Sequence, residues 1–157
     1  MTEATNVRVR KTVTVRATQR RAFTVFTEGY GTWWPREHHL GDADLVDAII
    51  EPFAGGRFYE KGADGSECDW GSVLSYEPPH RVVLSWHLQG DWRYDPDPAR
   101  ASEIEVRFIA EAPDRTRVEL EHRHIERHRL AERVVEGIES PDGWSGILLR
   151  YVDAVAG

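Results

Sequence analysis

Apolar and polar residues alternate in a stretch near the start of the chain. Within VRVRKTVTVR, Val7, Val9, Val13 and Val15 share one parity, and polar residues occupy most of the other positions. Side chains of a strand point alternately to its two faces, so this period of two indicates a strand with one buried face. We therefore predict a first strand over residues 7–16.

A helical region follows this strand. Thr18 is a typical N-cap residue, and Ala22, Phe23 and Phe26 then share one helical face. Two glycines soon interrupt this pattern, and Pro35 ends it. The pattern predicts two short helices and then a polar loop.

Six strand-length segments separated by turn residues fill most of residues 46–126. They read VDAIIEPF, RFYEKG, CDWGSVLSYE, RVVLSWHL, SEIEVRFIAEA and TRVELEHRHI. No long helical period interrupts them, so with the first strand they predict an antiparallel sheet of seven strands. One intervening stretch, QGDWRYDPDPARA, is too rich in Asp and Pro to pair, and we expect it to be an exposed connection that carries Trp92 and Tyr94.

The chain ends in helical periods. HRLAERVVEGIE indicates a modest helix, and Ser140 followed by Pro141 predicts the N-cap and first turn of a terminal helix. Apolar residues recur along this last helix at helical spacing: Trp144, Ile147, Leu148, Tyr151, Val152 and Val155. Such a stripe needs a large apolar partner, and one face of the sheet is the partner that the chain offers. The fold class is therefore α+β.

Composition narrows the class of protein. A length of 157 residues favours one domain over residues 1–157, with a core at about 7–155. Apolar residues make up 40% and charged residues 30% of the chain, as in folded globular proteins. The net charge of −7 disfavours nucleic acid and anionic membranes as partners. The single Cys68 excludes an intramolecular disulfide, and no signal-peptide or membrane-spanning stretch is evident, so we expect a cytoplasmic location.

Several segments, in this order, resemble the SRPBCC (START-like) superfamily, and within it the group named after the activator of the heat-shock-protein-90 ATPase. They are RAFTVFTEGYGTWWP, EPFAGGRFYE, DGSECDWGSVLSYEPPHRVVLSW, IEVRFIAEAPDRTRVELEHR and GWSGILLRYV. The resemblance implies a helix-grip fold, in which a curved seven-stranded antiparallel sheet surrounds a long C-terminal helix and leaves a cavity. It also implies ligand binding, a cyclase or hydrolase activity, or chaperone activation, because members differ in function. Almost nothing precedes the first strand, which argues against a two-domain chaperone clamp.

Tryptophans are the first candidates for lining such a cavity. Trp34, Trp86 and Trp144 lie on elements that the implied fold brings together, and rigid aromatic walls suit an apolar or ring-shaped ligand. Core packing is the more common reason for a large aromatic residue at any one of these positions. The full set of predicted ligand-binding residues is Trp34, Trp70, Trp86, His122, His124, Trp144, Leu148 and Tyr151.

Two histidines are the candidates for chemistry. His122 and His124 lie two apart in VELEHRHI, so a strand would place both on the inward face. An interior imidazole can transfer protons near neutral pH, so these two are the catalytic candidates if the protein is an enzyme. They could also begin a metal site with the His38-His39 pair, but the sequence identifies no complete ligand set, and we predict no metal.

The leading functional hypothesis is binding of a small apolar or aromatic molecule in an internal cavity, without a permanent cofactor. A cofactor-free cyclase or hydrolase that uses a cavity His or Tyr is the first alternative. The second is a protein-interaction module like the chaperone ATPase activator. A homodimer and a chaperone both stay open as partners.

Overall fold

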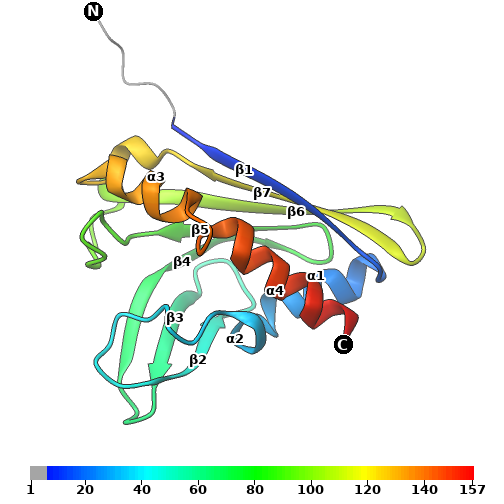
Figure 1. The fold of residues 1–157 in the computed structure, drawn as a ribbon, viewed down its shortest axis with the longest axis horizontal. Coiled ribbons are helices and arrows are strands. Elements are labelled where there is room, and N and C mark those ends of the chain that lie inside the picture. Colours follow the sequence, from blue (N-terminus) through cyan, green and yellow to red (C-terminus); the bar gives the residue numbers. More distant parts are fainter. Residues whose placement is uncertain (1–6) are drawn as a thin grey trace, which may run out of the picture.

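One seven-stranded antiparallel sheet organises the computed structural model, which describes residues 7–157. The strand order is β1-β7-β6-β5-β4-β3-β2, so β1 pairs with the last strand and every other pair is consecutive in sequence (Figure 1). The strands are β1 (Val9–Val15), β2 (Leu45–Ile50), β3 (Arg57–Gly62), β4 (Glu67–Glu77), β5 (Arg81–Trp86), β6 (Ser102–Ala112) and β7 (Arg115–Arg123). The predicted seven-stranded antiparallel sheet is confirmed.

Helices follow the first and the last strand. They are α1 (Gln19–Thr27), α2 (Tyr30–Trp33), α3 (Ala131–Glu139) and α4 (Trp144–Ala156). The short 3-10 turn η1 (Pro98–Arg100) lies between β5 and β6, and η2 (Ile125–Arg127) follows β7. Thr18 caps α1 as predicted, because its hydroxyl oxygen accepts the backbone N–H of Arg21 at 3.1 Å.

The apolar stripe of α4 is buried against the concave side of the sheet and against α1. Its buried members are Trp144, Ile147, Leu148, Tyr151 and Val155. In Figure 1, α4 (red) crosses one side of the sheet beside α1. The hydroxyl of Tyr151 donates a hydrogen bond of 2.7 Å to the carbonyl of Ala22, which joins the two helices. The helix-grip α+β fold expected from the sequence is therefore the observed one.

The prediction that Ser140 caps the terminal helix is wrong. Its hydroxyl donates to the carbonyl of Gly137 at 2.7 Å, so Ser140 closes α3 instead. A turn follows, and α4 begins at Trp144 with Gly143 as its N-cap. A Cβ at Gly143 would clash with the carbonyl of Ile138, so the tight junction between the two helices requires glycine there.

The prediction that His122 and His124 share one strand face is also wrong. Strand β7 ends at Arg123, and His124 has a left-handed φ of 61°. The alternation of side chains stops where the backbone leaves the extended region, so only His122 follows the inward parity of Val118 and Leu120.

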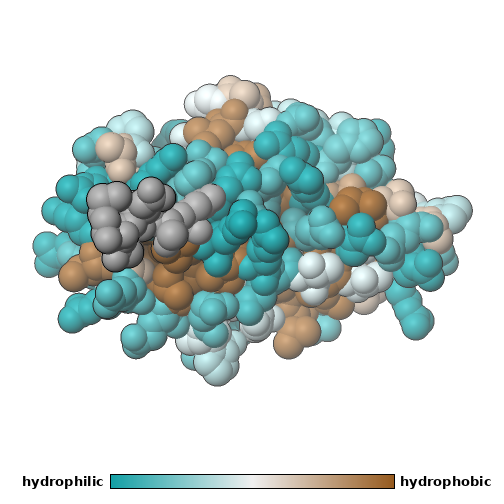
Figure 2. Space-filling model, turned by 90° about the horizontal axis from the view of Figure 1, so that it is seen from above, coloured by the Kyte–Doolittle hydropathy of each residue, from teal (hydrophilic) through white to brown (hydrophobic). Residues whose placement is uncertain are grey.

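Charged side chains cover the opposite face of the sheet. The carboxylate of Glu105 is only 6% exposed and accepts hydrogen bonds from Arg81, Arg107 and Arg123. Burial by itself raises the pKa of Glu105, but these three arginines outweigh it and lower the pKa to about 2. Seen from above, the surface is mainly hydrophilic, with hydrophobic residues in small separate patches (Figure 2). Among residues 7–157, no helix is both long and apolar enough to cross a bilayer.

Candidate functional site

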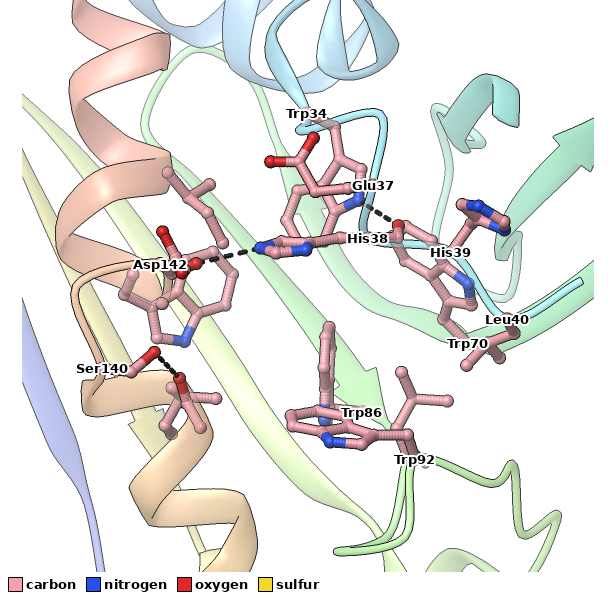
Figure 3. A pocket seen from close by; sticks show the side chains of 16 residues that line it. Trp34, Glu37, His38, His39, Leu40, Trp70, Trp86, Trp92, Ser140 and Asp142 are labelled. Atoms are coloured by element: carbon pink, nitrogen blue, oxygen red, sulfur yellow. Dashed lines mark hydrogen bonds between the residues drawn. The ribbon is translucent and has the colours of Figure 1, made fainter. Parts of the chain in front are cut away.

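A pocket of about 400 Å³ lies between the sheet, the start of α4 and the loop that follows α2 (Figure 3). Strands β4 and β5 contribute to one side, α3 and α4 to another, and residues 34–40 to a third. Its apolar lining residues are Trp34, Leu40, Trp70, Trp86, Leu88, Trp92, Ile138, Trp144 and Ile147. This volume and this lining are typical of sites for small organic molecules.

Four buried tryptophans in the pocket wall, which we call the tryptophan box, form a closed ring of contacts with one another. The separations between ring centroids are 5.1 Å for Trp34–Trp70, 6.3 Å for Trp70–Trp86, 6.3 Å for Trp86–Trp144 and 6.2 Å for Trp34–Trp144. Centroid distances of 4.5–7 Å are those of favourable aromatic pairs, so each indole supports its neighbours. The structure thus brings together four residues that the sequence singled out.

Three of the four indole N–H groups in the tryptophan box have acceptors within the protein. They are the carbonyl of His38 for Trp34 (2.8 Å), the carboxylate of Glu60 for Trp70 (2.8 Å) and Nδ1 of His122 for Trp144 (3.1 Å). The buried N–H of Trp86 has no acceptor among residues 7–157. A buried donor without a partner costs about 1–3 kcal/mol, so the pocket wall keeps one unsatisfied polar group.

His122 lies behind the wall of the pocket, in contact with Trp144. It is fully buried and belongs to a chain of hydrogen bonds in which Ser102 Oγ lies 2.7 Å from Nε2 of His122 and 2.7 Å from Nε2 of His128. Burial, and then the nearby His128, lowers the pKa of His122 to about 3. Both ring nitrogens of His122 are occupied, so its imidazole does not open into the pocket and is not placed to transfer a proton there.

Three further predicted ligand-binding residues lie outside the pocket lining. His124 is half-buried at the start of η2, with its ring nitrogen 3.7 Å from a carboxylate oxygen of Glu126. Leu148 packs in the core, and the hydroxyl of Tyr151 is used by α1. Leu148 and Tyr151 share the buried stripe with Trp144 but lie one and two turns further along α4, beyond the pocket.

The loop after α2 supplies pocket residues that sequence reasoning did not place there. Nε2 of His38 lies 3.0 Å from the carbonyl oxygen of Asp142, so this loop is joined to the turn before α4. His39 and Leu40 also line the pocket. The sequence offered His38 and His39 only as loop residues for completing a metal site, because nothing in a polar loop indicates which space it covers. Within residues 7–157, no three His, Cys, Asp or Glu side chains come together as metal ligands.

Glu60 attaches that loop to the sheet. Its buried carboxylate accepts the backbone N–H of Leu40 at 2.6 Å and of Gly41 at 3.2 Å, besides the indole N–H of Trp70. The sequence did not indicate a buried glutamate, because Tyr59 and Glu60 are adjacent in β3 and alternation would bury only one of them. Strand β3 keeps its alternation: Glu60 shares the inward face of Phe58, and the guanidinium of Arg57 covers the ring of Tyr59 on the other face.

Trp92, noted in the sequence as part of an exposed connection, covers the mouth of the pocket. It is 44% exposed, has a left-handed φ of 61° and lines the pocket. Its ring lies so close to α3 that a Cβ at Gly137 would come within 2.6 Å of Trp92 Cζ2. Glycine at position 137 therefore permits the close packing of this indole on the helix.

The chain matches one protein family over most of its length. Residues 16–149 match the model of the family described as Activator of Hsp90 ATPase homolog 1-like protein. This match confirms the resemblance seen in the sequence. No functionally curated protein matches the chain.

Solved structures give two relatives that are similar in both sequence and fold. One is the anthrahydroquino-gamma-pyrone synthase Txn09, with 39% identity, a TM-score of 0.65, and coverage of 94% of this chain and 96% of that one. The other is the self-sacrificing resistance protein CalC from Micromonospora echinospora, with 34% identity, a TM-score of 0.71, and coverage of 94% and 93%. Protein MLL2253 from Mesorhizobium loti is similar in fold alone, with 18% identity, a TM-score of 0.66, and coverage of 96% and 97%.

Proposed function

The chain belongs to the family of Activator of Hsp90 ATPase homolog 1-like proteins, and within this family we propose that it binds a small, neutral ring compound in the tryptophan box. The observation that carries the proposal is the set of four mutually contacting indoles in the wall of a space of about 400 Å³. Flat aromatic walls of this kind contact a flat ligand over a large area, and they lose little conformational entropy when it binds.

The charges at the pocket favour a neutral ligand over a fatty acid. None of the sixteen lining residues is a lysine or an arginine. The charged lining residues are the exposed acids Glu37 and Asp142, which would repel a carboxylate. An anionic ligand would therefore enter an apolar site without a cationic partner, which is costly.

A cofactor-free cyclase is the second candidate, because the relative with 39% identity is described as a synthase. His122 does not support this candidate, since it does not open into the pocket. A histidine that does line the pocket is His38. A surface module that recognises another protein is less favoured, because the apolar residues meet in a pocket rather than on an exposed face.

Binding is tested with 2-methoxynaphthalene as the probe and dodecanoate as the charged comparison. We expect the naphthalene to quench tryptophan fluorescence and to raise the melting temperature, because a ligand of the native state adds about 2.7 kcal/mol of stability at a hundredfold excess over Kd. Dodecanoate should have little effect on either signal.

Two variants of α4 locate the binding. Ile147 lines the pocket, so Ile147→Trp should fill the space and abolish the shift. Leu149 is 62% exposed on the same helix, so Leu149→Trp should leave the shift intact. Equal responses of the two variants, or no response of the native protein to the naphthalene, would overturn the proposed function.

A further inference from the structure

His38 presents an unused hydrogen-bond acceptor to the pocket. Its Nε2 lies 3.0 Å from the carbonyl oxygen of Asp142, and a carbonyl oxygen can only accept. Nε2 therefore carries the proton in the neutral imidazole, and Nδ1 carries a lone pair. No residue in the described part of the chain forms a hydrogen bond to this Nδ1.

The position of this acceptor is held by several contacts. The backbone carbonyl of His38 accepts the indole N–H of Trp34 at 2.8 Å, and the two rings meet edge to face with centroids 6.0 Å apart. Two residues further along the loop, the backbone N–H of Leu40 donates a hydrogen bond to the carboxylate of Glu60. Figure 3 shows the imidazole of His38 reaching across the pocket toward Asp142. A polar group that is fixed before binding loses little entropy when a ligand meets it.

The ring of Trp86 lines the same pocket, but its N–H does not open into it. Its buried N–H lacks an acceptor among the described residues. Of these two groups, Nδ1 of His38 is therefore the one that a ligand in the pocket can reach. In a site that is otherwise apolar, a few such groups determine which ligands are preferred.

We propose that His38 is a specificity residue that selects ring compounds bearing a hydroxyl group, by accepting the hydroxyl hydrogen at Nδ1. This inference rests on the proposed function and names the chemistry of the ligand at that site. A molecule of the same shape without a hydroxyl hydrogen would bind, but less tightly.

Three probes separate this preference from binding itself. 2-Naphthol can donate a hydroxyl hydrogen, 2-methoxynaphthalene cannot, and naphthalene controls for size. Titration calorimetry at a pH where the imidazole is neutral should show 2-naphthol binding about 3- to 10-fold more tightly than the ether, the range expected for one net hydrogen bond.

His38→Gln is the decisive variant. The amide nitrogen of glutamine can still donate to the carbonyl of Asp142, but glutamine has no atom in the place of Nδ1, and its amide oxygen lies next to Nε2 instead. The ratio of the affinities for 2-naphthol and the ether should therefore fall to about one, whatever the change in overall affinity. His39→Gln is the matched control, because Nδ1 of His39 is bound to the carbonyl of Gly41 at 2.7 Å and its ring points away from Trp86 and Asp142 in Figure 3. That variant should keep the preference.

A spectroscopic measurement checks the same assignment without relying on affinity. The ¹⁵N shifts of His38 in the free protein should be those of the Nε2–H tautomer, and 2-naphthol but not the ether should move the Nδ1 resonance. If both probes bind the native protein equally, or if His38→Gln keeps the preference, the role of His38 is overturned while the proposed function stands. If none of the three naphthalenes binds, the proposed function itself fails.

Discussion

The indole nitrogen of Trp144 donates a hydrogen bond of 3.1 Å to Nδ1 of His122. Because Nδ1 accepts, the proton of the neutral imidazole is on Nε2, which then donates to Ser102, and the hydroxyl of Ser102 donates to His128. The whole chain of bonds has one direction, from the pocket wall into the core. The hydrogen bond to His122 therefore orients the indole of Trp144 in the tryptophan box.

Replacing His122 by phenylalanine should destabilise the protein. The new ring fills a similar volume but leaves the indole N–H of Trp144 and the hydroxyl of Ser102 with one partner fewer. A buried polar group left without its partner costs about 1–3 kcal/mol, so we expect the free energy of unfolding to fall by about 2–4 kcal/mol. Urea denaturation followed by far-UV circular dichroism measures this loss.

The neighbouring His124→Asn is the control for that experiment. His124 is half-buried and left-handed, and asparagine tolerates this backbone conformation better than most residues. The change in stability should stay within about 1 kcal/mol. A loss as large as that of His122→Phe would contradict the assigned role of His122.

Stability should decline as the pH falls below about 6.5, the ordinary pKa of histidine in an unfolded chain. Burial is the main cause that lowers the pKa of His122 to about 3 and that of His128 to about 4. Between these folded pKa values and pH ~6.5, the unfolded chain takes up protons that the folded chain does not. The stability that the two histidines contribute above pH ~6.5 is therefore lost progressively as the pH falls toward their folded pKa values. Each histidine contributes a slope of up to about 1.4 kcal/mol per pH unit.

Urea titrations between about pH 7 and pH 5 test this dependence. His122→Phe should show roughly half the native slope, because one of the two protons is no longer taken up on unfolding. Glu105→Gln should keep the native slope there, because a carboxylate with its pKa lowered to about 2 contributes stability that is lost only below its unfolded value near ~4.3. A native stability independent of pH over this range would refute the prediction.

Glu60→Gln should loosen the loop that carries His38. The carboxylate accepts the N–H groups of Leu40, Gly41 and Trp70 with two oxygens. Glutamine has only one acceptor oxygen, and its NH₂ group cannot accept a hydrogen bond. Loss of hydrogen bonds to a charged group should cost about 1.5–3 kcal/mol. Amide exchange at Leu40 and Gly41 should accelerate at least about tenfold if the loop opens locally by that amount.

Glu67→Gln is the corresponding surface control. Glu67 is 38% exposed and pairs with Arg57 on the protein surface, so this variant should change stability by less than about 1 kcal/mol and leave the exchange of Leu40 as it is. Unchanged exchange in Glu60→Gln would show that the buried carboxylate does not hold the loop.

Gly137→Ala should displace Trp92 from the mouth of the pocket. The added Cβ would come within 2.6 Å of the indole, so the exposed ring has to move. We expect the emission of Trp92 to change and 2-methoxynaphthalene to bind faster. Alanine also favours the helix over glycine by about 1 kcal/mol, a gain that displacement of the indole offsets.

The same substitution made in a Trp92→Ala protein separates the helix propensity of alanine from the displacement of the indole. There the substitution at Gly137 should stabilise the protein by up to about 1 kcal/mol and leave the rate of probe binding unchanged. An equal gain in both backgrounds, with no change in binding rate, would show that Trp92 does not cover the pocket.

Local periodicity determined the elements of this protein. Val9 and Val15 alternate with polar residues, and Trp144, Ile147 and Tyr151 recur with the period of a helix, so strand β1 and helix α4 follow from the chain itself. The seven strands and the buried stripe of α4 were predictable because burial on one face imposes the same period along a whole element. The tryptophan box could be anticipated in part, since the resemblance to the superfamily indicated which elements meet.

Only the tertiary structure decided which side chains reach the pocket. His38 meets Asp142 across 104 positions of sequence, and no local pattern contains that contact. Glu60 is buried because the loop after α2 and the indole of Trp70 pack against its carboxylate, and His124 leaves the inward face because β7 ends one residue before it. Periodicity describes how each residue faces relative to its neighbours in the chain, whereas these positions depend on how separate elements pack. That packing placed His122 behind the wall of the pocket and His38 within it.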